Sequence, residues 1–536
     1  MTFIRSISGF RGTIGGPEHD NLTPLDVVRS TVGYGSWILS RFSATENRPR
    51  PLVVVGRDAR PSGDMVQRLV TGTLMGMGID ILDLGLSTTP TVEMAVTGEG
   101  ANGGIILTAS HNPVQWNALK LLDSAGTFIS ASDGAEVIRR SAEPHTYSDV
   151  SNLGTVSAHD GWIDAHIQAI LELDLVDRGA ISGAGFKVAV DAVNSTGGIA
   201  VPALLKALGV DEVVELYCEP HGRFPHNPEP RPEHLTELSR TVVDHGCHLG
   251  ITVDPDVDRL AFINEDGSMF GEEYTLVAVA DHVLAHTPGP VVSNLSSTRA
   301  LRDVAKRHGQ THTASAVGEV NVVEAMRETN AVIGGEGNGG VIFPELHPGR
   351  DALVGIALML TLLAKRSCSM TALRATYPNY EMVKAKIDLD PTWDVDALLE
   401  GFAARQAQHD PLTVDGVKLD LPEGWVHLRK IQYRAHCPGL RGGGEPRGSP
   451  ETGGHLQRRP AGQRLILSKG VKIPNTFPYF VVLRTTGPQR NERVPRQCCN
   501  NADASGDCGC DAPLHAGPLR EPVFHTRVRT KDQNSH

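Results

Sequence analysis

The chain has 536 residues, of which 40% are hydrophobic and 21% charged, so it is long enough for several domains with buried cores. Its formal net charge of −12 disfavours nucleic acid or an anionic membrane as the main partner. The first residues, MTFIRSISGFRG, lack the apolar segment of a signal peptide, and we expect a soluble, cytoplasmic protein. The longest apolar run, residues 352–364, is too short to span a bilayer and predicts a buried helix.

The composition of the chain changes near Lys430. Residues 1–430 carry a net charge of −20, whereas residues 431–536 carry a net charge of +8. Five of the eight cysteines also lie in the second part, and the three in the first part are far apart, as is typical of reduced thiols. This contrast indicates that the two parts did not evolve as one sequence.

Apolar strand-like runs, each followed by a small-residue turn and a helix-like stretch, recur through the first part. Such units begin near residues 51, 186 and 289. Short Val/Ile runs that alternate with helical periodicity are typical of βα units in parallel or mixed sheets. The sequence therefore predicts an α/β fold of three related α/β domains with mixed sheets, followed by a smaller α+β C-terminal domain that is incomplete. The predicted segments are 1–155, 156–268, 269–372, 373–430 and a tail at 431–536.

The first motif is TASHNP (108–113), which follows the apolar run GGIIL. A serine at the end of a buried strand is held on a rigid element with its hydroxyl exposed, which suits a nucleophile or a phosphate carrier. The alternative is an ordinary Ser/Asn turn closed by Pro113.

The second motif is DPDVDRL (254–260), which follows the strand-like run HLGITV. If the backbone curves, the alternating carboxylates of Asp254, Asp256 and Asp258 can converge on one hard cation such as Mg²⁺. An EF-hand is excluded because Arg259 stands where that loop needs glycine, and because a strand precedes it. A solvated acidic loop is the remaining alternative.

The third motif is GGEGNGG (334–340). A glycine-rich turn lets the backbone approach a ligand, which leaves Glu336 and Asn338 as the side chains able to bind hydroxyl groups. The glycine spacing fits neither a P-loop nor a dinucleotide-binding turn, although a plain hairpin turn fits equally well.

In this order and at this separation, the motifs resemble the α-D-phosphohexomutase family, which contains phosphoglucomutases, phosphomannomutases and phosphoglucosamine mutases. The resemblance covers residues 1–430. The segments that carry it are SGFRGTIGG (8–16), GRDARPSG (56–63), TASHNP, WNALK (116–120), DPDVDRL, VGEVNV (317–322) and GGEGNGG.

The resemblance implies four domains, each giving one loop to a central cleft, and a role for each matching residue. Ser110 would be the phosphoserine, and a phosphoserine oxygen would join three aspartates in binding one Mg²⁺ per chain. Lys120 would be the general acid/base. The implied catalytic residues are Ser110, His111, Lys120, Arg11 and Arg259; the substrate-binding residues are Glu336, Asn338, Gly335 and Arg57; and the metal ligands are Ser110, Asp254, Asp256 and Asp258.

The implied reaction interconverts hexose 6-phosphate and hexose 1-phosphate. The phosphoserine donates to the sugar, and a hexose 1,6-bisphosphate serves as bound intermediate and activator. We expect phosphoglucosamine mutase activity, with phosphomannomutase or phosphoglucomutase activity as the alternative. The expected partner is a small hexose phosphate, with no nucleic acid and no membrane, and the expected assembly is a monomer or a homodimer.

Family members grip the non-transferring phosphate with a Ser-Asn-Thr-Glu-Pro-x-x-Arg or Ser-Gly-Thr-Glu-Pro loop in the fourth domain, and this chain lacks one. After Lys430 the sequence reads IQYRAHCPG. Permitted codons for those residues, read one base later, give Ser-Asn-Thr-Glu-Pro-Ile-Val-Arg. The sequence therefore predicts a frameshifted C-terminus after Lys430, with residues 431–536 out of frame and disordered.

Three further interpretations remain open from the sequence. A chain without the phosphate-gripping loop could be a catalytically impaired sugar-phosphate-binding remnant. A phosphatase would result if the phosphoserine hydrolysed faster than it transferred its phosphoryl group. The tail could also be a genuine basic extension, although Cys508 and Cys510 have no second pair at zinc-finger spacing.

Overall fold

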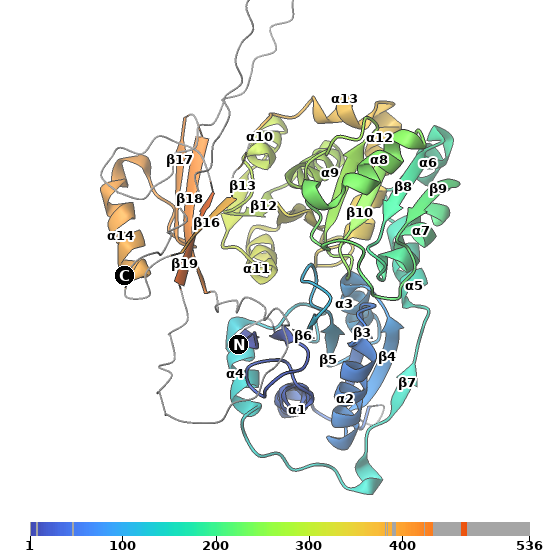
Figure 1. The fold of residues 1–536 in the computed structure, drawn as a ribbon, viewed down its shortest axis with the longest axis vertical. Helices are drawn as coiled ribbons and strands as arrows, with labels where there is room; N and C mark the ends of the chain where they lie inside the picture. The colour runs from blue at the N-terminus through green and yellow to red at the C-terminus, as the bar shows by residue number, and fades with distance from the viewer. Residues whose placement is uncertain are drawn as a thin grey trace, which may run out of the picture. The chain divides into compact units, whose positions relative to one another are not determined.

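The computed structural model describes residues 2–6, 9–45, 48–380, 382, 384–388, 393–422, 424–432 and 463–468. Over these residues, four β-sheets follow one another along the chain, and helices pack against each of them (Figure 1). The second and third sheets share one arrangement of four strands, and the first sheet contains the same arrangement among its seven strands. This confirms the predicted set of related α/β domains.

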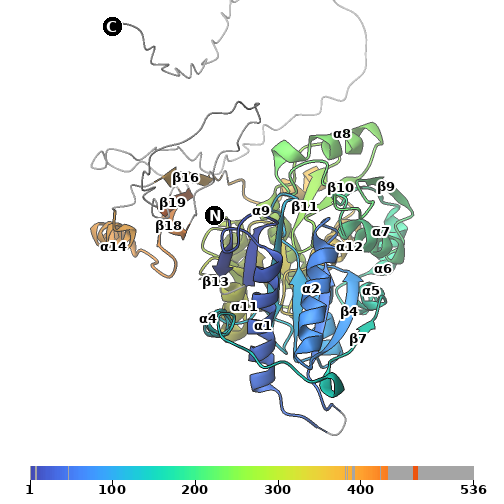
Figure 2. The same ribbon diagram turned by 60° about the horizontal axis from the view of Figure 1, so that its bottom comes forward.

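The first domain is a seven-stranded sheet of order β1-β2-β6-β5-β3-β4-β7. Alternate residues of β3 and β5 enter two separate apolar clusters, one with α1 and α2 and one with α3, so helices cover both faces. Figure 2 shows α1 and α2 side by side. The strands are β1 Ile4–Ser6, β2 Gly9–Thr13, β3 Leu52–Arg57, β4 Asp80–Leu86, β5 Gly103–Leu107, β6 Trp116–Leu122 and β7 Val156–Ala158. The helices are α1 Pro24–Arg41, α2 Gly63–Gly76, α3 Thr89–Gly98 and α4 Ala131–Arg140, with the 3₁₀ turn η1 Val150–Asn152.

The second and third domains contain four-stranded sheets of orders β11-β10-β8-β9 and β13-β12-β14-β15. In each sheet three strands are parallel and the last strand pairs antiparallel with the third. The second domain has α5 Trp162–Leu171, α6 Arg178–Ala184, β8 Lys187–Asp191, α7 Gly197–Ala207, β9 Glu212–Leu216, η2 Pro232–His234, α8 Thr236–Asp244, β10 Leu249–Val253 and β11 Leu260–Asn264. The third has α9 Glu272–His286, β12 Val291–Asn294, α10 Ala300–Arg307, β13 His312–Ser315, α11 Glu319–Thr329, β14 Ile333–Glu336, β15 Gly340–Ile342, α12 Ala352–Arg366 and α13 Met370–Arg374.

The three motif loops occupy equivalent positions in the three sheets. Each loop follows a strand that is parallel to one neighbour and leads into the antiparallel strand on its other side. The three loops join β5 to β6, β10 to β11, and β14 to β15. The serine, aspartate and glycine loops are therefore three versions of one connection. Three motifs that are distant in sequence therefore lie at the same position in their respective domains.

The apolar run 352–364 forms the buried helix α12, as predicted, but its packing was not foreseen. This helix contacts α9 of its own domain and also α5, α6 and α7 of the second domain. A single apolar cluster consequently runs from Ile163 to Tyr377 and joins the larger part of the two cores, while each domain also has a smaller apolar cluster of its own. No helix in the part of the chain that the structure describes is long and apolar enough to cross a membrane.

Two of the predicted domain boundaries differ from the structure. The first domain continues past residue 155, because β7 pairs in parallel with β4 of the first sheet. The third domain continues past residue 372, because Tyr377 is buried in the shared core and donates a hydrogen bond to Asp281. Pairing and packing partners that are distant in sequence set both limits, so local composition could not locate them.

The fourth sheet has the order β16-β19-β18-β17, and α14 packs on β17 and β18 (Figure 1). Its elements are β16 Lys384–Asp388, α14 Val395–Arg405, η3 Ala407–His409, β17 Val417–Leu421, β18 Gly424–Gln432 and β19 Gln463–Ser468. Strand β19 lies within the predicted tail, and its backbone pairs with β16 and β18 on its two sides. Strand β18 also continues two residues beyond Lys430, after which the frameshift is predicted. Residues 433–462 and 469–536 lie outside the described residues.

Arg299, the residue before α10, ties the third domain to the fourth sheet. Its guanidinium is 8% exposed and donates to Asp420 Oδ1 at 2.8 and 3.0 Å, and to the carbonyl oxygens of Leu421 and Gly424. It also lies over the ring of Trp425, 5.3 Å from the centroid.

We expect Arg299→Met to destabilise the fourth sheet by about 2–4 kcal/mol, because it removes a buried donor from two backbone carbonyl groups and from the partly exposed Asp420 carboxylate. The measurement is urea unfolding followed by tryptophan fluorescence, together with limited proteolysis of the fourth sheet. Arg302→Met is the matched control, since Arg302 pairs with the same Asp420 from an exposed position and its loss should cost under about 1 kcal/mol. Equal losses in the two variants would contradict the role of Arg299.

Candidate active site

Ser110 lies just after β5, where the chain turns sharply. Its φ angle is +49°, in the left-handed region that residues other than glycine seldom adopt, and its backbone N–H donates to Thr108 Oγ1 at 3.0 Å. The side chain is buried, and its hydroxyl donates to Asp254 Oδ2 at 2.7 Å. The strained turn therefore holds this hydroxyl against the aspartate loop of the second domain.

A buried arginine that sequence reasoning missed holds the serine loop in shape. Arg60 is 1% exposed, and its Nε donates to Asp58 Oδ2 at 2.9 Å. Its terminal nitrogens donate, at 2.5 to 3.0 Å, to the backbone carbonyl oxygens of Ser110, Asn112, Pro113 and Trp116. A rigid fork of donors is the property that lets one arginine serve four acceptors. Arg60 lies in the segment GRDARPSG, one of those that carry the family resemblance, and this could have marked it as a site residue.

Arg57, the arginine that was predicted to bind substrate, points elsewhere. Its Nε donates to Gln67 Oε1 at 2.7 Å, and its Nη1 donates to the carbonyl oxygen of Asp58 at 3.3 Å. Both contacts keep the side chain between β3 and α2, so the predicted role of Arg57 finds no support in this geometry.

The aspartate loop brings its three carboxylates together. Asp254, Asp256 and Asp258 are fully buried, and one oxygen from each lies within 4.8 Å of the others. Val257 at the tip has a φ angle of +63°, which is rare for a β-branched residue. This curvature turns alternate side chains to the same side, as the sequence-based metal site requires.

The donor set of this loop fits a hard divalent cation. The Oδ1 atoms of Asp256 and Asp258 are buried and have no hydrogen-bond partner among the described residues. Burial, together with the neighbouring charges of Asp258 and Asp256, raises the pKa of Asp254 well above its ordinary value. An oxygen-coordinated cation would supply the missing partners and the missing positive charge. The Ser110 hydroxyl lies beside Asp254, in reach of the same position.

Lys120 projects from β6 onto two of these carboxylates. Its Nζ lies 2.6 Å from Asp256 Oδ2 and 3.3 Å from Asp258 Oδ2. Burial opposes a charge on this amine, but the two aspartates outweigh burial and raise the pKa of Lys120 above its ordinary value. Lys120 is therefore an ammonium at neutral pH, suited to donating a proton and to stabilising negative charge.

Arg11 and Arg259 line the same cavity as Ser110. Burial and the adjacent charge of Arg259 lower the pKa of Arg11, and the same two causes lower the pKa of His111 well below its ordinary value. The Nε of Arg259 is buried without a hydrogen-bond partner among the described residues. Two close guanidinium groups with an unused donor form a site for an anionic group. The neutral His111 ring lies 3.4 Å from the Ser110 hydroxyl.

The glycine loop of the third domain supplies the predicted Glu336 and Asn338. Glu336 is 5% exposed and accepts hydrogen bonds from Asn294, from the backbone N–H of Gly318 and from Asn338. Gly335 has a φ angle of +152°, and a Cβ there would lie 2.0 Å from the carbonyl oxygen of Gly340. A side chain at position 335 is thus excluded, and Glu336 and Asn338 are left to face the cavity.

Arg350, which the sequence did not single out, connects the second and third loops. Its guanidinium donates to Asp258 Oδ2 at 2.6 Å, to Glu336 Oε2 at 2.7 Å and to Glu319 Oε2 at 3.0 Å. These three carboxylates outweigh burial and raise the pKa of Arg350 well above its ordinary value. No local motif marks this residue, because all its partners are distant in sequence.

One cavity of about 520 Å³ collects most of these side chains. Among its lining residues are Arg11, Ser110, Lys120, Arg259, Glu336, Asn338 and Arg350. A transferring phosphoryl group needs a positioned acceptor or donor, cationic groups around its oxygens and a cation. The fold and the site therefore define a class, the α/β enzymes that transfer phosphoryl groups.

Comparison with known proteins gives the family. The description "Phosphoglucomutase/phosphomannomutase, alpha/beta/alpha domain" matches residues 4–148 as domain I, 164–267 as domain II and 271–380 as domain III. A "Phosphoglucomutase/phosphomannomutase" of Thermococcus kodakarensis is 34% identical over 426 residues, which cover 78% of this chain and 91% of that protein. A "Probable phosphoglucosamine mutase" of Methanopyrus kandleri is 32% identical over 425 residues, covering 79% and 90%.

Solved structures agree in fold. A phosphoglucomutase/phosphomannomutase family protein of Burkholderia thailandensis has a TM-score of 0.68 at 23% identity, covering 87% of this chain and 93% of that one. A "putative phosphomannomutase" of Thermus thermophilus has a TM-score of 0.67 at 24% identity, covering 87% of this chain and 95% of that one. The chain belongs to the phosphoglucomutase/phosphomannomutase family and is a phosphohexomutase, an isomerase that acts by intramolecular phosphoryl transfer.

Replacing Arg60 by lysine should lower mutase turnover at least about tenfold, which corresponds to ~1.4 kcal/mol of activation free energy. A single ammonium cannot serve four carbonyl groups, so the serine loop should lose its fixed shape. Turnover and a thermal melt would be measured together to separate this effect from unfolding. Arg57→Lys, from the same segment, should stay within about twofold of the unchanged enzyme; comparable losses in both variants would contradict the assignment.

Proposed function

We propose that the chain interconverts hexose 6-phosphate and hexose 1-phosphate through a phosphorylated Ser110 and a bound hexose 1,6-bisphosphate. The observation that carries this proposal is the contact between the Ser110 hydroxyl and Asp254 Oδ2 at 2.7 Å. It places a nucleophilic side chain at the acidic cluster, inside a cavity lined by arginine and lysine. The cavity volume of about 520 Å³ suits a small organic phosphate.

In the proposed reaction, the phosphoryl group leaves the oxygen of Ser110 and bonds to the free hydroxyl of the sugar. The serine oxygen gains a proton from Lys120 as its bond to phosphorus breaks, and the proton lost by the sugar hydroxyl returns to Lys120. Lys120 is the proton donor, because the aspartates keep it protonated. The bisphosphate then turns around and returns its other phosphoryl group to Ser110, which restores the enzyme. Arg11 and Arg259 hold the negative charge of the group in transfer.

The cation at the aspartate loop is proposed to be Mg²⁺. Asp254, Asp256 and Asp258 would hold it through oxygen atoms, with one oxygen of the phosphorylated Ser110 completing the set. Bound there, a divalent cation supplies Lewis acidity and neutralises charge on the phosphoryl oxygens.

The proposed sugar is glucosamine phosphate. Glu336 presents an acceptor to the cavity and Asn338 an amide, which together can bind ring hydroxyls or an ammonium group. The Methanopyrus kandleri relative carries the name of a phosphoglucosamine mutase, whereas the Thermococcus kodakarensis relative is named for glucose and mannose phosphates. Turnover of glucosamine, glucose and mannose 6-phosphates, each with a trace of its own 1,6-bisphosphate, would decide among them. A preference for glucose or mannose would overturn this assignment without affecting the phosphoserine mechanism.

Ser110→Ala should abolish mutase turnover and remove a phosphate adduct from the intact mass. The fold should survive, because one hydroxyl at a strand end contributes little to a core. Ser124→Ala, in an exposed turn of the same domain, is the matched control and should keep both the turnover and the adduct. Undiminished turnover without Ser110 would refute the phosphoserine mechanism.

Asp256→Asn should weaken Mg²⁺ binding and turnover together, because it removes one of three charged oxygen ligands. Calorimetric titration of Mg²⁺ and turnover at increasing Mg²⁺ would test this, and excess metal should restore part of the activity. Asp244→Asn, at the exposed end of α8, serves as the control. Activity that survives a chelator in the unchanged enzyme would show the carboxylate cluster to be structural.

The predicted frameshift would leave the enzyme without its loop for the non-transferring phosphate. A chain in which Ser-Asn-Thr-Glu-Pro-Ile-Val-Arg follows Lys430 should bind hexose phosphate several kcal/mol more tightly, since each charge-assisted hydrogen bond to a phosphate adds roughly 1.5–3 kcal/mol. Turnover of the two chains also separates an active mutase from an impaired remnant. Equal activity of the two chains, together with protease resistance of the last hundred residues of the chain as written, would refute the frameshift and show the tail to be a real domain.

A further inference from the structure

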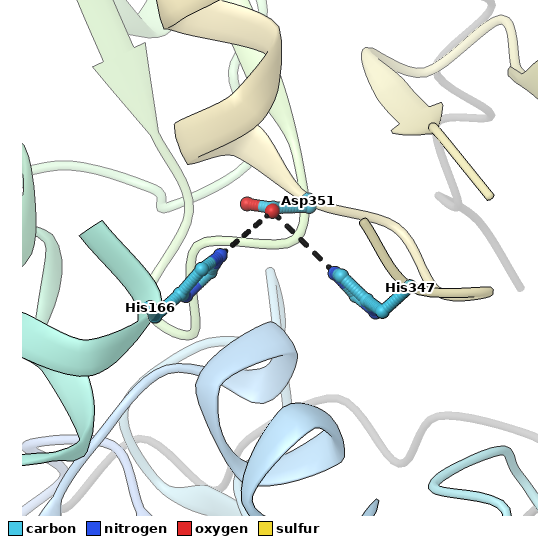
Figure 3. A group of neighbouring side chains, drawn as sticks. All are labelled: His166, His347 and Asp351. Atoms are coloured by element: carbon cyan, nitrogen blue, oxygen red, sulfur yellow. Dashed lines mark hydrogen bonds and ion pairs between the residues drawn. The ribbon is translucent and has the colours of Figure 1, made fainter. Parts of the chain in front are cut away.

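A second buried cluster of metal-ligating side chains lies outside the phosphoryl-transfer site. His166 from α5 and His347 from the loop before α12 both point at the carboxylate of Asp351, the residue that caps α12 (Figure 3). His166 and Asp351 are completely buried, and His347 is 6% exposed. One ligand atom from each of the three lies within 4.8 Å of the others.

Two of the distances between these atoms can be compared with those between ligands around a small cation; the shorter is also a hydrogen-bond distance. Asp351 Oδ2 lies 2.9 Å from His166 Nε2 and 3.4 Å from His347 Nε2. Four ligands at Zn²⁺ bond lengths of roughly 2.0–2.1 Å in a tetrahedron stand about 3.3 Å apart. Although His347 is buried between carboxylates, neither of its ring nitrogens makes a hydrogen bond within the described residues. Its position is therefore explained better by coordination than by hydrogen bonding.

The outer nitrogen of each ring faces an oxygen acceptor. His166 Nδ1 lies 3.0 Å from Thr91 Oγ1, and His347 Nδ1 lies 3.4 Å from Glu93 Oε2. Both acceptors come from α3 of the first domain. Metal-bound histidines in proteins usually donate their second N–H in this way, which fixes the tautomer and the ring orientation. The Glu93 carboxylate is 2% exposed and has no hydrogen-bond partner among the described residues, so it is free to accept.

We propose that His166 Nε2, His347 Nε2 and Asp351 Oδ2 bind a Zn²⁺-class divalent cation, with Glu93 and Thr91 as the outer partners of the histidines. Two imidazoles and one carboxylate select Zn²⁺ or a similar transition metal, whereas the all-oxygen aspartate loop selects a hard cation. The ligands come from the second and third domains and their outer partners from the first. The cation would thus fasten three domains at one buried point.

Cobalt substitution in the full chain tests this proposal, because tetrahedral Co²⁺ absorbs visible light strongly and octahedral Co²⁺ at an oxygen site absorbs weakly. Metal-free protein would be titrated with Co²⁺ and then with Zn²⁺. The unchanged chain should develop a strong absorption that Zn²⁺ abolishes, and Zn²⁺ should raise the melting temperature. Asp256→Asn should keep both signals, since it alters only the aspartate loop.

His166→Gln and His347→Gln should each lose the cobalt absorption and the Zn²⁺-induced shift, while circular dichroism checks their folding. His282→Gln is the control, as His282 is buried in α9 away from the cluster and should keep both signals. Glu93→Gln retains every ligand and should weaken Zn²⁺ binding roughly 10–100-fold. This variant therefore tests the metal site even if the histidine variants fail to fold. No strong absorption in the unchanged chain, or signals unaffected by His347→Gln or by Glu93→Gln, would overturn the proposal and leave a hydrogen-bonded cluster without metal.

Discussion

The ion pairs of Arg350 are the constraint on which the rest of the site depends. One guanidinium neutralises carboxylates from the aspartate loop, the glycine loop and the start of α11, all of them buried. Without that charge, Asp258, Glu319 and Glu336 would repel one another in a region with little water, where unpaired charges are costly. The second and third domains can therefore present their loops to one cavity because a shared cation lies behind both.

Negative charge still exceeds positive charge around the aspartate loop, which favours the binding of a further cation. Arg350, Lys120 and Arg259 outweigh burial and hold the pKa of Asp258 below its ordinary value, whereas burial and its acidic neighbours raise the pKa of Asp254. A site arranged in this way accepts one further cation readily. On the opposite side, Arg11 and Arg259 repel each other until an anion separates them. The cavity is thus prepared for a metal and a phosphate together.

Sequence alone predicted what local patterns encode and missed what distant partners determine. Ser110 and the three aspartates directly follow apolar strands, so the sequence predicted both the motifs and their positions at the ends of those strands. Arg60 and Arg350 act through backbone carbonyls and through carboxylates far away in the chain, which no local pattern reveals. The helix at 352–364 was predicted from its apolar run, but its contact with two domains was not. Strand β19 was missed because its pairing with β16 and β18, rather than its own periodicity, defines it.

The core that α12 shares between the second and third domains limits how this enzyme can move and fold. Unfolding either domain alone would expose the apolar face of α12 to water, so the two should melt as one cooperative unit. A hinge between them would have to break that packing, whereas the apolar clusters of the first domain are separate from the one that contains α12. Any opening and closing of the active-site cavity must therefore pivot where the cores are separate, with the second and third domains moving together as a single rigid unit.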